Sequence, residues 1–350
     1  MDLSEIETWL RETDDDALRC LWQRADCVRR DCVGDQVHLR GLVEFSNYCA
    51  RSCAYCGLHR GNRSIPRYRM TPDEIVDCAR LAHAYGYGAV VLQSGEDRGM
   101  ETATLSGIIG RIKQETNLAV TLSVGERDID EFAEWRAAGA DRYLLRFETS
   151  NPSLYARIHP DLPGRPSDRI ALLAKLRKLG YEVGSGVMIG IPGQTYADLA
   201  QDIAQFAALN LDMVGVGPYI PHPDTPLGAQ APPASPEQAP NTEMMTYKTI
   251  AITRIVCPYA NIPATTALAT LNRRRGRELG LLRGANVLMP NMTPVKYRHE
   301  YQIYPDKACL MEDAAGCRVC MRIRVQSIGR YCGTGRGDSP NFSQREVRTA

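Results

Sequence analysis

The sequence predicts an α/β fold: a (β/α)8 TIM-type barrel with an N-terminal helical extension and a C-terminal extension. Short apolar segments alternate with amphipathic helical segments along most of the chain, a pattern that indicates a parallel sheet covered by helices. About eight such repeats within about 250 residues are the usual content of a barrel. A doubly wound open sheet and a six-stranded partial barrel are the alternatives, and no Gly-x-Gly-x-x-Gly opens a helix after the first strand.

The elements are expected in the following order. Residues 1–35 are polar with apolar residues at helical intervals, which predicts a helical segment. We place the barrel in residues 36–307 and a C-terminal extension in residues 308–350. The expected strands are Leu42–Ser46, Ala89–Gln93, Leu118–Leu122, Arg142–Arg146, Glu182–Ile189, Asp212–Gly217, Asn261–Thr266 and Asn286–Met289.

Local signals support helices between these strands. Thr71–Glu74 has a capping Thr, then Pro and acidic residues, which is typical of a helix start. Gly139 and Gly180 stand where helices should end. The Pro-, Ala- and Gln-rich stretch Pro221–Asn241 predicts a long loop after the sixth strand, over the barrel mouth. The Arg-, Gly- and Ser-rich last thirty residues predict an irregular end.

Composition excludes several classes of protein. Hydrophobic residues make up 44% and charged residues 24% of the 350 residues, as in soluble enzymes. The net charge of +1 implies no general attraction to nucleic acid or to a membrane, so the basic run Arg273–Arg277 is interpreted as a solvated loop. No apolar run could span a bilayer and the N-terminus is acidic, so we expect a cytoplasmic protein.

The chain has 12 cysteines. In a reducing compartment such a number favours metal binding or catalysis over disulfides. Six of them form two tight clusters, and six are scattered and are interpreted as buried or incidental thiols. The scattered cysteines are Cys20, Cys27, Cys32, Cys78, Cys257 and Cys332.

The first cluster has the spacing Cys49-x3-Cys53-x2-Cys56 and follows the first expected strand. Loops after barrel strands face the catalytic end. Thiolates suit iron–sulfur clusters, and three ligands on a four-iron cluster leave one iron open for a substrate. The alternatives are a structural zinc site with His59 as fourth ligand, or cysteines that bind nothing.

The motif resembles that of the radical S-adenosylmethionine (SAM) superfamily. Tyr55 precedes the third cysteine, Ser94-Gly95-Glu96 resembles the Gly-Gly-Glu element of the superfamily with Ser in place of the first Gly, and Gly186–Gln194 resembles its later glycine-rich strand. The resemblance implies a 4Fe–4S cluster held by the three cysteines, which reductively cleaves SAM to a 5′-deoxyadenosyl radical.

Within this superfamily the sequence resembles the HydE family of FeFe-hydrogenase maturases over roughly residues 37–322. The matching runs are Tyr68–Glu74, Val91–Glu96, Gly139–Arg146, Ile220–Leu227 and Asn261–Ala267. The resemblance implies a role in assembly of the hydrogenase di-iron site, with an organometallic iron–cysteine complex bearing CO and cyanide as substrate. It also implies the maturases HydG and HydF as partners and a reducing electron donor.

The resemblance also implies roles for single residues. Those expected against SAM are Tyr55, Ser94, Gly95, Glu96, Arg146, Glu148, Arg169 and Met213. Those expected around the substrate are Ser123, Thr265, Thr266, Tyr301 and Tyr304. Each has a purely structural alternative: a local ion pair for Arg146 with Glu148, an exposed helix charge for Arg169, and core packing or backbone capping for the others.

The second cluster, Cys309-x7-Cys317-x2-Cys320, follows the eighth expected strand. Three thiols at these spacings favour a metal site over unligated cysteines. Some HydE-family members carry an accessory iron–sulfur cluster at this place, so the resemblance implies a second cluster of 2Fe–2S or 4Fe–4S type.

Two other functions stay open. A radical SAM amino-acid mutase or sulfur insertion enzyme, of the methylornithine synthase or biotin synthase type, would share the barrel and the motif. A non-catalytic iron–sulfur scaffold would bind iron without cleaving SAM. The second cysteine cluster and the run Pro221–Pro226 favour the HydE family over the first, and the SAM motifs count against the second.

Overall fold

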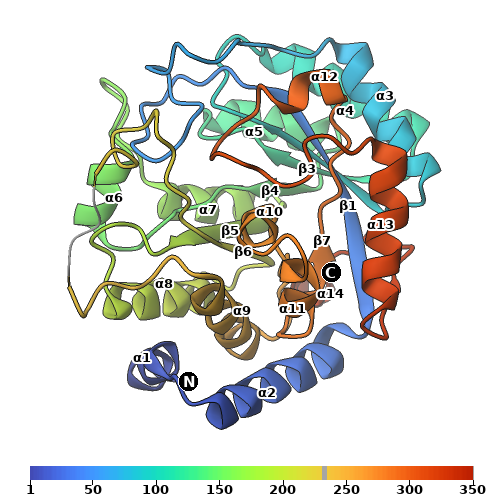
Figure 1. The fold of residues 1–350 in the computed structure, drawn as a ribbon. Helices are drawn as coiled ribbons and strands as arrows, with labels where there is room; N and C mark the ends of the chain where they lie inside the picture. The colour runs from blue at the N-terminus through green and yellow to red at the C-terminus, as the bar shows by residue number, and fades with distance from the viewer. Residues whose placement is uncertain (231–234, 350) are drawn as a thin grey trace.

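The computed structural model describes residues 1–230 and 235–349. A curved parallel sheet forms the centre of the molecule, with the strand order β6-β5-β4-β3-β2-β1-β7 (Figure 1). The strands are β1 (Gln36–Ser46), β2 (Ala89–Ser94), β3 (Ala119–Ser123), β4 (Arg142–Leu144), β5 (Glu182–Ile189), β6 (Met213–Pro218) and β7 (Val287–Leu288). The predicted fold class is confirmed: the sheet is a TIM-type partial barrel with helices on its outer face.

The seventh expected strand, Asn261–Thr266, is not a regular strand. Residues 261–263 make only isolated parallel bridges, Met213 with Asn261 and Pro263 with Val287. Pro263 has no N–H to donate to a ladder, and Thr265 already caps the next helix, α10 (Thr266–Leu271). These bridges nevertheless place the segment between β6 and β7, which is the position of the seventh strand in a complete barrel.

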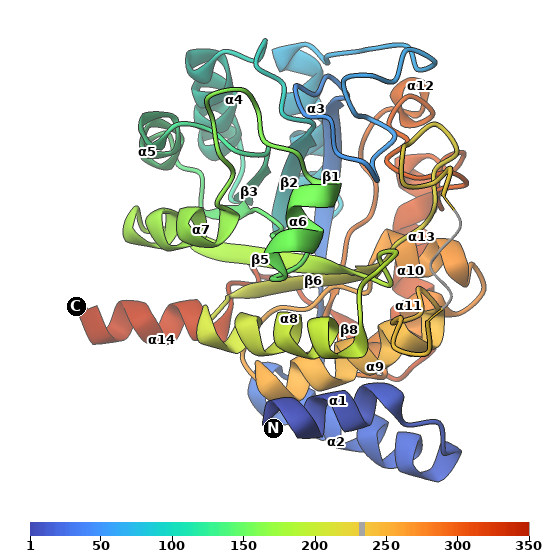
Figure 2. The same ribbon diagram turned by 90° about the vertical axis from the view of Figure 1, so that its left-hand side faces the viewer.

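Helices follow most strands and cover the outer face of the sheet (Figure 2). The expected helix start at Thr71 is a complete capping box with Glu74, and Gly139 and Gly180 take positive φ, each two residues after the end of a helix. The helices along the barrel are α3 (Pro72–Ala84), α4 (Thr102–Glu115), α5 (Ile129–Ala137), α6 (Pro152–Ile158), α7 (Arg169–Lys178), α8 (Tyr196–Ala208), α9 (Glu243–Val256) and α11 (Gly276–Leu281).

The N-terminal helices α1 (Leu3–Arg11) and α2 (Asp15–Val33) pack against α8 and α9 (Figure 2). Ile6 and Leu10 are buried in this contact, as the helical spacing of the apolar residues predicts. Lys248 on α9 donates hydrogen bonds to the carbonyls of Leu10 and Glu12, which ties α1 to the barrel.

The C-terminal region is more regular than the sequence predicts. After α12 (Val295–Arg298) and α13 (Ala314–Gln326), strand β8 (Tyr331–Cys332) pairs in parallel with the start of β1, and α14 spans Pro340–Thr349. The expectation of an irregular end is therefore wrong for the described residues.

The long loop after β6 lies beside the loop that carries Cys49, Cys53 and Cys56, called the cysteine loop from here on. The backbone N–H of Leu227 donates to the carbonyl of Ala54 at 2.9 Å, and the ring of His222 lies close to Gly57. Part of the expected loop, residues 231–234, lies outside the described residues. In the parts of the chain that the structure describes, no helix has both the length and the apolar character that crossing a membrane requires.

Candidate active site

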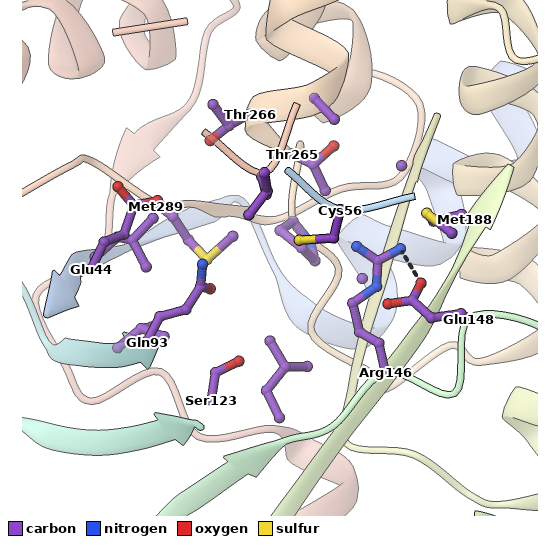
Figure 3. A pocket seen from close by; sticks show the side chains of 18 of the residues that line it. Glu44, Cys56, Gln93, Ser123, Arg146, Glu148, Met188, Thr265, Thr266 and Met289 are labelled. Atoms are coloured by element: carbon purple, nitrogen blue, oxygen red, sulfur yellow. Dashed lines mark ion pairs between the residues drawn. The ribbon is translucent and has the colours of Figure 1, made fainter. Parts of the chain in front are cut away.

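A cavity of about 330 Å³ opens at the carboxyl ends of the strands. Side chains from β1, β2, β3 and β5, from the loops after β1, β4 and β7, and from the start of α10 point into it (Figure 3). The cavity brings together all three cysteines of the first cluster and all residues expected around SAM and substrate: Cys49, Cys53, Cys56, Tyr55, Ser94, Gly95, Glu96, Ser123, Arg146, Glu148, Arg169, Met213, Thr265, Thr266, Tyr301 and Tyr304.

The cysteine loop is held against the end of β2. The N–H of Ala50 donates to the carbonyl of Glu96 at 3.0 Å. A Cβ added at Gly95 would lie 2.3 Å from the carbonyl oxygen of Tyr48 and 2.8 Å from Cβ of Cys49. Only glycine therefore permits this close approach of two backbones.

The three cysteines fit an iron–sulfur cluster. All line one cavity, and none is in a disulfide. Burial raises the pKa of Cys49 and Cys53, and raises the pKa of Cys56 to about 12, so the free thiols are neutral and would release protons on ligating a metal.

The zinc alternative does not fit the geometry. In the described part of the chain, the one group of three His, Cys, Asp or Glu side chains with ligand atoms all within 4.8 Å of one another is Glu96, Glu126 and His159. A zinc ion with Zn–S bonds near 2.3 Å would need sulfurs about 3.8 Å apart. The expected fourth ligand, His59, instead contacts the carbonyl of Asp224 at 3.0 Å.

A buried network of charged side chains lies under the cysteine loop. Arg51 contacts Glu96 at 2.7 Å and Glu126 at 2.8 Å, and Arg169 contacts Glu126 at 2.8 Å. Burial alone would raise the pKa of Glu126, but the charge of Arg169 and the hydrogen bonds from Ser167 and Arg169 lower it well below its usual range. Both carboxylates are thus neutralised by guanidinium groups, so this group of ligands is an ion-pair network and not a metal site.

His159 completes this network. Its Nδ1 lies 3.0 Å from Sγ of Cys53 and its Nε2 lies 3.1 Å from Nη2 of Arg169. Burial and the charge of Arg169 lower its pKa to about 4, so the ring is neutral.

Arg146 and Glu148 line the cavity, where they are expected to meet SAM, and they also form the local ion pair of the structural alternative at 3.1 Å (Figure 3). Glu148 has φ of 62°, a left-handed conformation that is uncommon outside glycine. Arg169 is buried and donates to the carbonyl of Arg146 at 2.7 Å, so it is not the exposed helix charge of the alternative interpretation.

The opposite wall of the cavity carries the residues expected near the substrate. Ser123 ends β3 and lies beside Gln93, whose amide donates to the hydroxyl of Tyr301 at 3.3 Å. Thr265 lines the cavity while its Oγ1 accepts from the N–H of Leu268 at 3.3 Å, so it also has the capping role of its alternative. Met213 is buried against Arg40, with 2.8 Å between Sδ and Nη1.

Several residues in or beside the cavity are not predicted from the sequence. Glu44 and Lys307 form a buried ion pair at one end of the cavity. Glu44 and Gln93 stand near the ends of expected strands, which is a usable signal. Arg51 lies inside the cysteine motif itself, whereas Glu126, His159 and Lys307 carry no local signal.

The second cysteine cluster lies outside this cavity. Cys317 and Cys320 stand one helical turn apart on α13, and Cys309 lies on the preceding loop with φ of 67°. Arg277 donates to Sγ of Cys309 at 3.3 Å. The hydrogen bond from Cys317, together with Arg277, lowers the pKa of Cys309.

The fold, the cysteine loop and the surrounding cavity define a radical SAM enzyme, and residues 43–206 match the family described as the Radical SAM superfamily. The chain is 47% identical over 313 residues to "[FeFe] hydrogenase maturase subunit HydE" of Thermotoga maritima, covering 89% of this chain and 86% of that protein. It therefore belongs to the HydE family of radical SAM enzymes, which act in hydrogenase maturation.

More distant relatives share the fold. The chain is 26% identical over 288 residues to 3-methylornithine synthase of Methanosarcina acetivorans, covering 81% of this chain and 77% of the relative. The crystal structure of methylornithine synthase (PylB) superposes with a TM-score of 0.81 at 22% identity, over 99% of this chain and 96% of that one. For HydG, a maturase of the [FeFe]-hydrogenase, the TM-score is 0.70 at 19% identity, over 83% and 64%.

Proposed function

We propose that Cys49, Cys53 and Cys56 ligate a 4Fe–4S cluster, and that SAM binds beside it in the cavity. The observation that carries the proposal is the convergence of three thiols from one loop with the SAM-motif residues of four other segments. When bound, the cluster and SAM together supply a 5′-deoxyadenosyl radical by one-electron cleavage of the sulfonium. The protein's part is to bind, orient and shield these groups.

Three charged side chains suit the polar parts of SAM. Arg169 is the cation assigned to the SAM carboxylate, and the ion pairs with Glu126 and Glu96 hold its guanidinium in place. Glu148 and Arg146 offer an acceptor and a donor on the same wall. The backbone at Gly95 approaches the cysteine loop closely enough to meet the amino group of a ligand bound there.

We propose that the substrate is an organometallic iron–cysteine complex with CO and cyanide ligands. The residues assigned to it are Ser123, Thr265, Thr266, Tyr301 and Tyr304. Their hydroxyls, with the amide of Gln93, can donate to the anionic ligands of such a complex. HydG would supply the complex, HydF would receive the product, and a reducing protein of the cytoplasm would supply electrons.

We further propose that Cys309, Cys317 and Cys320 hold an accessory iron–sulfur cluster, of 2Fe–2S or 4Fe–4S type. Its position outside the cavity excludes contact with the substrate and suits a structural or electron-relay role. In this scheme residues 1–35 are a helical segment, residues 36–307 are the catalytic barrel, and residues 308–350 are an extension.

Complementation tests the maturase function. We expect this chain to restore hydrogenase activity to a host that lacks its own HydE, whereas the Cys53→Ala variant fails. Restoration by the Cys53→Ala variant would contradict the proposal, because it would separate maturation from the radical chemistry.

A radical amino-acid mutase is the second candidate, because methylornithine synthase superposes over 99% of this chain. The discriminating experiment offers the reduced protein SAM and candidate amino acids and looks for 3-methylornithine. Formation of this product, together with no complementation, would favour the mutase.

A further inference from the structure

His159 is a buried side chain that no motif points to, yet it contacts a proposed cluster ligand. It lies in the residue after α6, is 1% exposed, and places Nδ1 3.0 Å from Sγ of Cys53. A ring nitrogen at this distance from sulfur is favourable only if a proton lies between them. In a cluster-bound protein Cys53 is a thiolate without a proton, so the proton must be on Nδ1.

The other side of the ring fixes this tautomer. Nη2 of Arg169, which can only donate, lies 3.1 Å from Nε2 of His159. Nε2 must therefore offer its lone pair. Oε1 of Glu126 lies 3.3 Å from the same nitrogen, but it already accepts from Nε of Arg169 at 2.8 Å and from Oγ of Ser167 at 2.7 Å. A neutral ring that accepts at Nε2 carries its proton on Nδ1.

We propose that His159 is a positioning residue that donates an N–H···S hydrogen bond to the Cys53 thiolate and thereby raises the reduction potential of the catalytic cluster. A hydrogen bond to a cluster sulfur stabilises the more negative, reduced state. Through Arg169 the same ring is linked to the guanidinium assigned to the SAM carboxylate. The hydrogen-bond chain therefore connects the place where SAM binds to one sulfur ligand of the cluster.

The test measures the potential of the reconstituted cluster by EPR-monitored redox titration, without SAM. His159→Leu keeps an apolar volume and removes the donor, while His159→Asn keeps an amide N–H near the place of Nδ1. We expect His159→Leu to lower the equilibrium constant for one-electron reduction up to tenfold, a shift of about 59 mV. His159→Asn should restore most of the difference.

His83→Leu is the matched control, because it makes the same substitution at an exposed position of α3, outside this network. Its cluster should have the potential of the unchanged protein. Equal potentials for His159→Leu and the unchanged protein, or an equal shift in His83→Leu, would overturn the proposal.

A second measurement needs no leucine variant. Pulsed EPR of the reduced cluster in protein labelled with 15N-histidine should show a weakly coupled nitrogen that His159→Asn abolishes. Absence of this coupling in the unchanged protein would also overturn the inference.

The inference rests on the proposed assignment of Cys53 as a cluster ligand, and the two fail differently. If Cys53→Ala retains the cluster, the assignment of the ligands fails. If Cys53→Ala loses the cluster while His159→Leu keeps the unchanged potential, the role of His159 alone fails.

Discussion

Glu148 combines an unusual backbone with a place in the cavity wall. Its φ of 62° costs conformational energy in a non-glycine residue, and such residues concentrate at functional sites. The side chain is 6% exposed and pairs with Arg146. The strain is understandable if the carboxylate is held there to meet a ligand, which is the role proposed for SAM.

Glu148→Gln should therefore weaken SAM binding. Loss of a charge-assisted hydrogen bond is worth about 1.5–3 kcal/mol, so the Kd for SAM should rise roughly tenfold or more. Binding is measured anaerobically from the change that SAM causes in the EPR spectrum of the reduced cluster. Glu237→Gln, which alters an exposed ion pair with Arg11, is the control and should bind SAM normally. An unchanged Kd in Glu148→Gln would remove this residue from the SAM site.

Asp202 on α8 makes a pH-dependent contribution to stability. It is fully buried and accepts hydrogen bonds from Ser150 and Gln194, which lie after β4 and β5. Burial raises its pKa from 3.8 to about 6. Because the folded state holds the proton more tightly, the stabilising effect is complete below pH 3.8 and is lost as the pH rises through about 6.

Asp202→Asn should remove this dependence. Relative to the unchanged protein, the variant should gain about 2 kcal/mol between pH 4 and pH 7, because this range covers most of a shift of about two pKa units. Urea unfolding of the metal-free proteins at the two pH values measures the difference. A difference that is constant with pH would show that the Asp202 pKa is not raised on folding.

At this scale the sequence predicts the residues that belong to motifs and misses those that act through distant contacts. Every predicted SAM and substrate residue lies at the cavity. Glu126 and His159 escape prediction because these contacts are distant in the chain. The N–H of Glu126 donates to Glu96, 30 positions away, and His159 lies against Cys53, 106 positions away. No local periodicity encodes such a contact.

At the scale of elements, the end of β2 positions the cysteine loop. Gly95→Ala should push this loop away, because the new Cβ would meet the backbone oxygen of Tyr48 at 2.3 Å. We expect the reconstituted variant to lose most of the iron at the first site, measured by iron and sulfide content.

Gly110→Ala is the matched control for this substitution. Gly110 lies within α4 with nothing within 4 Å of the added Cβ, so alanine should stabilise the helix by about 0.5–1 kcal/mol and leave the iron content unchanged. Full iron in Gly95→Ala would contradict the tight-approach argument.

The elements also show where sequence prediction succeeds. Glu182–Ile189 is predicted to the residue: it lies between two turn glycines, Gly180 and Gly190, and all its residues are buried, as in a parallel strand covered on both faces. The segment around Asn261 is overestimated as a strand, since Pro263 interrupts the ladder. β8 and α14 are missed because their stability comes from docking on β1 and the barrel base.

At the scale of the whole molecule, the C-terminal segment closes the base of the barrel. Arg142, fully buried, contacts Glu182 at 2.5 Å and also reaches Asp338 at 2.5 Å. Arg40 donates to the carbonyl of Gly337 at 3.1 Å. These contacts satisfy charges inside the barrel at the end opposite the cysteines, and they separate the cavity from solvent at the base.

Deletion of residues 333–350 should therefore destabilise the barrel. Loss of partners of buried charges typically costs about 3–5 kcal/mol, which should appear in the free energy of unfolding of the metal-free protein in urea. Arg336→Ala, which removes an exposed ion pair with Asp141, should cost less than about 1 kcal/mol. A deletion that costs no more than this control would show that the segment is not needed to close the base.

The central claim is that the first cysteine loop and the cavity above it perform radical SAM chemistry. The most direct measurement is anaerobic: the protein is reconstituted with iron and sulfide, reduced and given SAM, and 5′-deoxyadenosine is quantified beside the Cys53→Ala variant. The account predicts product from the unchanged protein and none from the variant. Intact SAM in the presence of a reduced cluster, with the iron–cysteine complex added as substrate, would contradict it.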